Sequence, residues 1–141
     1  MRTWRAYLRA VNLISRRLND GLKAAGELTI EDYEVLVQLS EAKDQRLRMS
    51  DLSQRLVHSQ SRLTQRIDRL AKRGFVHREK CPVDRRVTYA CLTGEGLEAL
   101  VKTAPHHVQD VRHALIDLIE PSEHAGLTDL FERIIDNLTE S

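Results

Sequence analysis

Apolar residues recur at three- and four-residue steps through the start of the chain, at Trp4, Tyr7, Leu8, Val11, Ile14, Leu18 and Leu22. This spacing predicts an amphipathic helix that ends between Gly21 and Gly26. A second helix is expected from Thr29, because Thr-Ile-Glu-Asp is a capping-box pattern with Asp32 at the third helical position. The polar segment EAKDQR that follows this helix is predicted to be a turn.

The middle of the chain changes from helical to strand-like patterns. Ser50 is expected to cap a short helix, and Ser59 to cap another helix a few residues later. Gly74 follows the basic end of this second helix, as is typical of a helix C-terminus. The apolar stripe of the helix that Ser59 caps consists of Leu63, Ile67 and Leu70. Two β-prone runs come next, FVHREK and VTYACL, and they predict a two-stranded hairpin with a basic tip.

Helical spacing returns after the hairpin. Thr93 is expected to cap a long helix, which Pro105 should kink or interrupt by one turn. Pro121 and Ser122 are expected to open a last amphipathic helix, whose apolar face needs a partner surface. The chain is therefore predicted to be mainly α with a small β-hairpin.

Length and composition exclude several classes of protein. A chain of 141 residues forms a single domain. It has no run of about 18 apolar residues, so neither a membrane span nor a membrane partner is expected. Two cysteines are too few for a disulfide framework and suit a reducing compartment, so we expect the cytoplasm.

Charge is distributed unevenly along the chain. The whole protein carries 22 basic and 21 acidic residues, but residues 45–88 hold twelve basic and four acidic ones, a net charge of +8. The remainder has a net charge of −7. A basic middle segment is typical of a nucleic-acid-binding surface. A solvated charged surface would give the same pattern.

The order of helix, short turn, helix and basic hairpin predicts a winged helix-turn-helix. An α-helix fits the major groove of DNA, where base edges carry a distinguishing pattern of donors and acceptors. The helix over 59–73 presents such donors opposite its apolar stripe, although they would also suit the wet face of an ordinary helix. The expected DNA-binding residues of this helix are Ser59, Gln60, Ser61, Arg62, Thr64, Gln65, Arg66 and Arg69. Arg85 and Arg86 at the hairpin tip could enter the adjacent minor groove.

Four stretches of the chain resemble the MarR family of bacterial transcriptional regulators. They are LTIEDYEVLVQLSEA, RLRMSDLSQRL, SQSRLTQRIDRLAKRGFVHREKCPVDRR and YACLTGEG. The most specific motif is D-x-R followed by L-T-x-x-G, here Asp84 to Arg86 and then Leu92 to Gly96. The segment from Ser59 to Val76 adds the family pattern S-x-S-x-x-T-x-x-x-x-R-L-x-x-x-G-x-V. The resemblance covers almost the whole chain.

This resemblance implies a homodimer that binds an inverted-repeat operator in double-stranded DNA. Residues 1–28 and 94–141 would form the dimerisation helices, and residues 29–93 the DNA-binding lobe. Arg86 would reach the minor groove, and Asp84 is expected to orient the wing-tip arginines through an ion pair, although Asp also suits a plain turn. Relatives often carry Arg where this chain has Gln60 and Gln65, and Gln favours adenine over guanine.

The resemblance also implies a repressor that releases DNA when a small aromatic or phenolic effector binds. Trp4, Tyr7 and Tyr33 are the candidate ligand-binding residues, with plain core or interface packing as the simpler role. An alternative is a thiol-responsive regulator. Cys81 lies near basic residues that could lower its pKa, whereas Cys91 suits packing, and an internal disulfide between them is not expected.

Two further alternatives come from the remaining chemistry. A metal-responsive regulator could use His106, Asp110 and His113, which share one helical face, but any histidine-containing helix offers that spacing, so no metal or cofactor is expected. No nucleophile elbow, phosphate loop or HExxH motif is present, so an enzyme is not expected. A helical interaction module without DNA binding would not need the basic segment.

Overall fold

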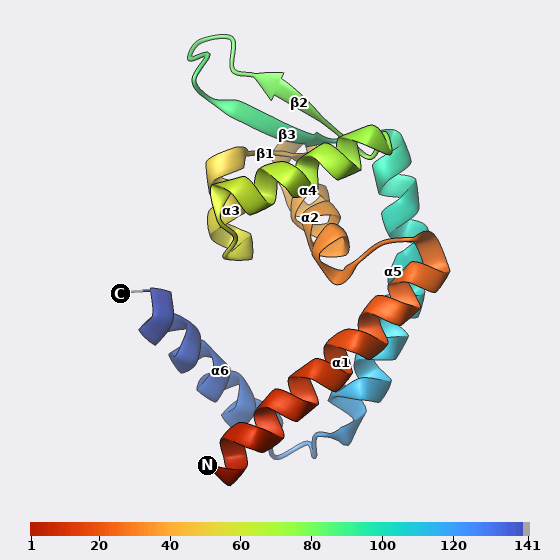
Figure 1. The fold of residues 1–141 in the computed structure, drawn as a ribbon, viewed down its shortest axis with the longest axis vertical. Helices are drawn as coiled ribbons and strands as arrows, with labels where there is room; N and C mark the ends of the chain where they lie inside the picture. Colours follow the sequence, from red (N-terminus) through yellow and green to blue (C-terminus); the bar gives the residue numbers. More distant parts are fainter. Residues whose placement is uncertain (140–141) are drawn as a thin grey trace.

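The computed structural model describes residues 1–139, and its long helices form an arm that carries a lobe (Figure 1). Helix α1 (Arg2–Gly26) packs along α5 (Gly94–Ala114). A short 3-10 turn over 116–118 then leads to α6 (His124–Thr139). Helix α5 continues through Pro105, so the interruption expected there does not occur. Its packing along α1 outweighs the loss of one backbone hydrogen bond. No helix in residues 1–139 is long and apolar enough to cross a membrane.

The lobe contains three helices, α2 (Ile30–Glu41), α3 (Met49–Leu56) and α4 (Gln60–Lys72). The predicted capping box at Thr29 is confirmed, since its hydroxyl accepts from the Asp32 N–H and the Asp32 carboxylate accepts from the Thr29 N–H. The Ser59 cap of α4 is confirmed as well. The prediction for Ser50 is wrong. Helix α3 begins at Met49 with no side-chain cap, because a strand runs directly into it.

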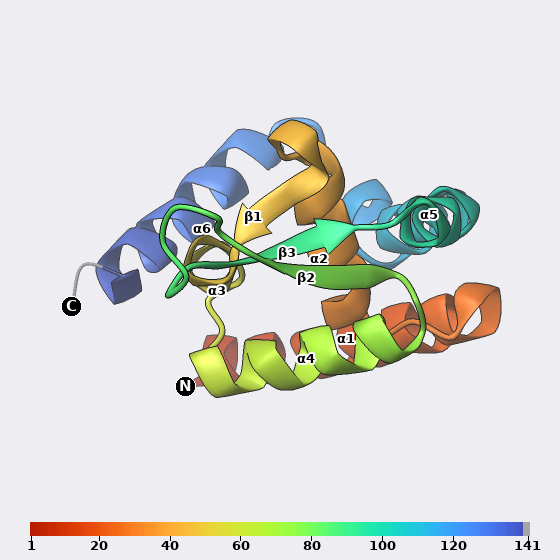
Figure 2. The same cartoon turned by 90° about the horizontal axis from the view of Figure 1, so that it is seen from above.

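A three-stranded antiparallel sheet replaces the predicted two-stranded hairpin. Strands β2 (Val76–Lys80) and β3 (Thr88–Leu92) form the hairpin, and β1 (Arg46–Arg48) pairs with the other edge of β3. The segment EAKDQR was expected to be a turn throughout, whereas its last residue starts β1. A strand of three residues has too little periodicity to be seen in the sequence, and it is stabilised only by pairing with β3. Figure 1 shows the hairpin projecting beyond the helices of the lobe, and Figure 2 shows α4 running alongside it.

The core lies where α1, the lobe helices and the sheet meet. The predicted stripe of α4, formed by Leu63, Ile67 and Leu70, is almost completely buried. The other fully buried apolar residues that pack with it include Leu22, Leu28, Val35, Leu36, Leu39, Leu52, Val76 and Ala90. Each buried Leu, Ile or Val side chain contributes about 1.5–3 kcal/mol, so the lobe is a rigid platform for α4.

The hairpin is anchored to the start of α5. The Thr93 hydroxyl caps α5 by accepting from the Gly96 N–H at 3.0 Å, and it donates to the Gly74 carbonyl at 2.6 Å. A Cβ at position 96 would collide with the Phe75 carbonyl oxygen, so only glycine allows this approach. The L-T-x-x-G motif therefore fixes the base of the hairpin against α4 and α5.

Candidate DNA interface

Helix α4 follows α3 after a tight turn at residues 57–59. The Ser53 hydroxyl donates to the His58 carbonyl at 2.5 Å, and Val57 has a left-handed φ of 53°. Ser59 then satisfies a free N–H at the start of α4, because its hydroxyl accepts from the Arg62 N–H at 3.2 Å. These contacts fix the direction in which α4 leaves the turn.

The face of α4 opposite its buried stripe is polar and open to solvent. Ser61 and Gln65 lie farthest from the stripe, and Gln60 and Thr64 lie on the side of the wing. The side chains of Gln60, Ser61 and Gln65 carry both donors and acceptors, as base-edge readout requires. The structure therefore brings these four predicted residues together on one exposed surface.

The three predicted arginines of α4 point elsewhere, toward acidic residues at the start of α2. Arg62 pairs with Glu31 at 2.7 Å, and Arg69 pairs with Asp32 at 3.2 Å. Arg66 contacts both acids, and its Nη1 lies 2.9 Å from an Asp32 carboxylate oxygen. The Arg66 side chain is 12% exposed and that of Asp32 1%. A DNA contact by Arg66 remains a prediction that this position does not favour.

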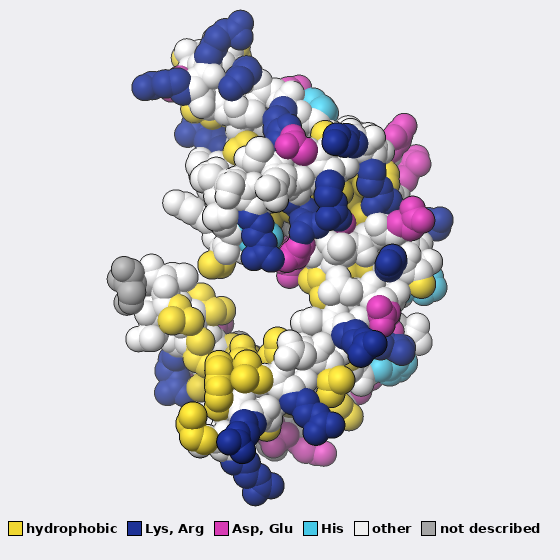
Figure 3. All heavy atoms as spheres, in the orientation of Figure 1, with side chains coloured by type: hydrophobic (Ala, Val, Ile, Leu, Met, Phe, Trp, Pro, Cys, Tyr) yellow, Lys and Arg dark blue, Asp and Glu magenta, His cyan; other side chains and the backbone are white. Residues whose placement is uncertain are grey.

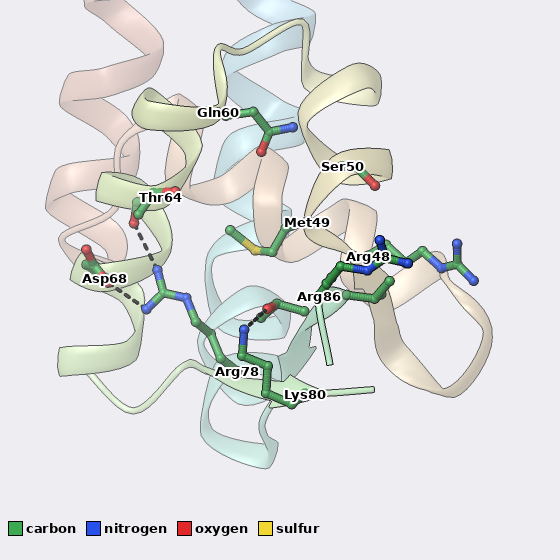
Figure 4. Close-up of a pocket in the computed structure, with 11 residues that line it drawn as sticks. Arg48, Met49, Ser50, Gln60, Thr64, Asp68, Arg78, Lys80 and Arg86 are labelled. Carbon is green, nitrogen blue, oxygen red and sulfur yellow. Dashed lines mark hydrogen bonds and ion pairs between the residues drawn. The ribbon is translucent and has the colours of Figure 1, made fainter. Parts of the chain in front are cut away.

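A basic groove separates α4 from the wing (Figure 4). It has a volume of about 610 Å³, and Arg48, Arg78, Lys80 and Arg86 supply its cationic lining. Figure 4 shows Arg78 reaching α4, where it pairs with Asp68 at 2.6 Å and donates to the Thr64 carbonyl at 3.2 Å. Arg78 therefore ties β2 to α4, so the spacing between helix and wing is fixed by a charge-assisted contact.

At the wing tip, Asp84 and Arg86 form a two-point ion pair. The Arg86 Nε and Nη2 atoms lie 3.1 and 3.2 Å from the two Asp84 carboxylate oxygens, and the Arg86 N–H donates to the same side chain. Hydrogen bonds from Arg86 lower the pKa of Asp84. Both roles expected for Asp84, ion pairing and turn formation, are therefore present. The Arg86 side chain is 91% exposed, and Arg85 is exposed beside it.

The predicted effector residues do not form one site within a single chain. Trp4 and Tyr7 stack on each other at 5.7 Å between ring centroids, half-exposed near the start of α1. Tyr33 lies in α2, far along the molecule from that end (Figure 1), and packs on His107 of α5 with centroids 4.3 Å apart. Burial raises the pKa of Tyr33 and lowers that of His107, whose Nδ1 has no partner among the described residues.

The alternative sensor residues are also separated. Cys81 is partly exposed after β2, Cys91 is buried in β3, and neither is in a disulfide. Backbone N–H groups of Asp84 and Val83 lower the pKa of Cys81, whereas burial raises the pKa of Cys91 to about 11. Asp110, part of the metal-type spacing on α5, is paired with Arg17 of α1 at 3.0 Å.

Sequence reasoning missed four residues of the interface and its surroundings. Arg78 and Lys80 were visible in the basic segment but were not placed beside α4. Arg48 was hidden because β1 was not recognised. His107 could not be assigned a role beside the lobe, since nothing in the sequence shows that it meets Tyr33.

The lobe is a winged helix-turn-helix, the class of fold in which a helix and an adjoining hairpin contact DNA. A sequence model of the MarR family matches residues 28–88. Among solved structures, AbsC from Streptomyces coelicolor, described as a MarR family transcriptional regulator, is 41% identical, with a TM-score of 0.94 over 99% of this chain and 93% of that one.

Two further similar proteins are also described as transcriptional regulators. Sco3205 from Streptomyces coelicolor, a MarR family regulator solved in complex with DNA, is 37% identical, with a TM-score of 0.94 over 96% of this chain and 86% of that one. The HTH-type transcriptional repressor YetL of Bacillus subtilis (strain 168) is 29% identical over 86% of this chain and 76% of its own length. The chain belongs to the MarR family, whose members are transcriptional regulators and not enzymes.

Proposed function

We propose that the protein is a homodimeric repressor that binds an inverted-repeat operator in the cytoplasm and releases it when a small aromatic effector binds. One observation carries the DNA-binding part. The open polar face of α4 adjoins a groove lined by four cations, of which Arg86 lies at the wing tip with Arg85 exposed beside it. This surface matches a base-reading helix flanked by phosphate contacts.

On DNA, α4 would lie in the major groove. Gln60 and Gln65 would bridge adenine, while Ser61 and Thr64 would contact bases or phosphates. Arg48, Arg78 and Lys80 would neutralise the phosphates between α4 and the wing. Arg85 and Arg86 would reach the next minor groove, whose negative potential attracts arginine. Sco3205, a relative solved in complex with DNA, supports DNA binding, and the repressor name of YetL supports the direction of regulation.

The arm supports the homodimer. None of the described residues of α6 is buried, although its face carries Leu130, Phe131, Ile134, Ile135 and Leu138. Half-exposed apolar residues also lie on α1 and α5, and Figure 3 shows hydrophobic side chains gathered at the arm, away from the basic wing. A helix of this kind is not stable without a partner surface. A second copy of the arm supplies one, and two wings would then face two half-sites.

The hollow beside Tyr33 is the best candidate for the effector. It has a volume of about 320 Å³, and its walls include Val37, Leu56 and the rings of Tyr33 and His107, which pack on each other at a tilt of 46°. That size suits a single aromatic ring. Arg55 at the rim could pair with a carboxylate or phenolate. Trp4 and Tyr7 lie near the start of α1 and do not line this hollow, so their role in effector binding stays a prediction.

DNA binding is tested by titrating the purified protein onto the DNA that flanks its own coding region, with competitor DNA and a salt series. We expect saturable, specific binding that weakens steeply with salt. Lys43→Ala is the matched control, because Lys43 is an exposed cation of the lobe outside the groove. Gln65→Ala should weaken specific binding and spare non-specific binding. The proposal would be refuted if the protein bound this DNA only weakly and without sequence preference, and if selection from random duplexes also recovered no preferred sequence.

The dimer and the effector need separate measurements. Light scattering should give the mass of two chains, and Phe131→Glu with Ile135→Glu should shift it toward one chain. A panel of phenolic acids added to the protein–DNA complex should contain a compound that releases DNA. Tyr33→Ala should abolish that release without abolishing DNA binding. Release that persists in Tyr33→Ala would place the effector elsewhere.

A further inference from the structure

Three side chains with metal-ligand chemistry meet on the sheet, away from the DNA groove. His77 of β2 is directly opposite Cys91 of β3, and Glu79 follows two residues after His77. Opposed residues share a face of a sheet, as do residues two apart. Arg78, which reaches α4, points to the other face. The three side chains therefore occupy the face turned away from α4, at the base of the wing.

The distances within this cluster are close to those of a coordination shell. The His77 Nε2 atom lies 3.1 Å from the Glu79 Oε1 atom, and the ligand atoms of all three residues lie within 4.8 Å of one another. Ligands of a tetrahedral zinc ion, at about 2.0–2.3 Å from the metal, are roughly 3.3–3.8 Å apart. Small rotations of exposed side chains would bring the cluster to this geometry, since His77 and Glu79 are each about half exposed.

The ligand types also agree with one class of cation. Imidazole, thiolate and carboxylate together favour a borderline divalent ion such as zinc over magnesium or calcium, which prefer oxygen alone. Cys91 is only 6% exposed, so little water can stabilise a thiolate there. Its thiol also contacts the Glu79 carboxylate, whose negative charge disfavours a second anion. A bound cation would supply the missing positive charge and displace the thiol proton.

A neighbouring arginine leaves the required carboxylate oxygen free. Arg46 of β1 is opposite Cys91, stacks on the Tyr89 ring at 4.7 Å and lies 3.5 Å from the Glu79 Oε2 atom. It therefore contacts the Glu79 oxygen that does not face His77. Arg46 can orient the carboxylate while Oε1 turns to a metal, as hydrogen-bonded partners of ligands commonly do.

We propose that His77, Glu79 and Cys91 bind one divalent cation of the zinc type and thereby link β2 to β3 at the base of the wing. Three protein ligands would leave a fourth position for water. The link would hold the two strands that carry the wing tip. The proposal does not depend on the operator, the effector or the direction of regulation.

The test uses cobalt(II) as a coloured substitute for zinc in the full-length, reduced protein. We expect one cobalt per chain, a thiolate-to-cobalt absorption band, and loss of that band when zinc is added. Cys91→Ser should remove the band, and Cys81→Ser, the matched control at the other thiol, should keep it. His77→Ala and Glu79→Gln should each weaken cobalt affinity at least tenfold. Both alter exposed side chains, so they report on the site even if Cys91→Ser disturbs folding.

The outcomes separate this site from others on the chain. Cobalt bound by the histidines of α5 would give no thiolate band, and a band that disappears in Cys81→Ser would come from the wing turn. Either result, or the absence of a band in the unaltered protein, would overturn the proposal. Zinc should also raise the midpoint of thermal unfolding in the unaltered protein and not in His77→Ala.

Discussion

Arg66 and Arg86 belong to the same basic segment of the sequence, yet they lie in two regions of opposite character. Arg66, at the junction of α4 and α2, is 12% exposed and is held by two carboxylates and a hydroxyl. Arg86, at the wing tip, is 91% exposed and contacts one carboxylate that is itself in solvent. The charge is the same, but only Arg86 can exchange its partner for a phosphate or a base without leaving a buried acid unpaired.

The largest expected effect is therefore on stability, at Arg66. Arg66→Ala would leave Asp32, a buried carboxylate, without its closest cation. Breaking a buried pair costs about 3–5 kcal/mol, and we expect the lower end because Arg69 and the Thr29 N–H still contact Asp32. Urea unfolding at a fixed protein concentration measures this loss.

Arg62→Ala is the matched control for Arg66→Ala. Arg62 pairs with Glu31 from the same helix but is 61% exposed, so its loss should change the free energy of unfolding by less than about 1 kcal/mol. A different pair of results would restore the sequence-based assignment. If Arg66→Ala kept its stability and lost DNA affinity, Arg66 would be a base or phosphate contact after all.

At the wing the expected effect is on DNA and not on folding. Arg86→Ala should weaken operator binding roughly tenfold to a hundredfold, because a groove-inserted arginine contributes about 1–3 kcal/mol. Its thermal unfolding should match that of the unaltered protein. Anisotropy titrations with operator and random duplexes measure the change, with Lys43→Ala as the control. An unchanged affinity would remove the wing from the interface.

Much of the fold follows from periodic features of the sequence. The stripe of Leu63, Ile67 and Leu70 and the caps at Thr29, Ser59 and Thr93 each depend on a few neighbouring residues, and the structure has all of them. Strand β1 was missed because its stability comes from β3, about forty residues later. Local pattern cannot show a partner that only the folded chain supplies.

The residues of the candidate site also fall into two groups, those that local periodicity places and those that contacts between distant segments place. The sequence places Gln60, Ser61, Thr64 and Gln65 on one exposed face, because helical periodicity alone decides this. It cannot separate Arg66 from them, since the acids that attract Arg66 lie more than thirty residues earlier in the chain. The approach of His107 to Tyr33 is likewise a contact between α5 and α2 that no spacing reveals.

His107 differs from both Arg66 and Arg86, because its buried Nδ1 atom has no partner among the described residues. This predicts that the stability of the protein depends on pH. Burial lowers the pKa of His107, so His107 binds a proton near pH 6.5 in the unfolded chain but only at a lower pH in the folded chain. Stability is then full above this pH and falls as the pH drops below it, by at most about 1.4 kcal/mol per pH unit for one proton. Urea unfolding between pH 7.5 and 5.5 measures the slope.

A matched pair of variants assigns this slope. His107→Phe keeps a ring against Tyr33 and should flatten the pH dependence, whereas His113→Gln, at an exposed position of the same helix, should leave it unchanged. A slope that survives in His107→Phe would have to come from another titrating group.

The smallest effect is expected at Val57, where the backbone and not a charge sets the cost. Val57 ends α3 with a φ of 53°, a left-handed conformation that disfavours β-branched residues, and its side chain is 76% exposed. Val57→Gly should therefore stabilise the protein by about 1 kcal/mol and raise its unfolding midpoint by about 2–4 °C. Val83→Gly, an exposed change at the wing turn without positive φ, is the control. If Val57→Gly instead lowered both stability and DNA affinity, the turn would need the valine side chain to set the direction of α4, and the separation of structural from DNA-contacting residues would not hold at the start of that helix.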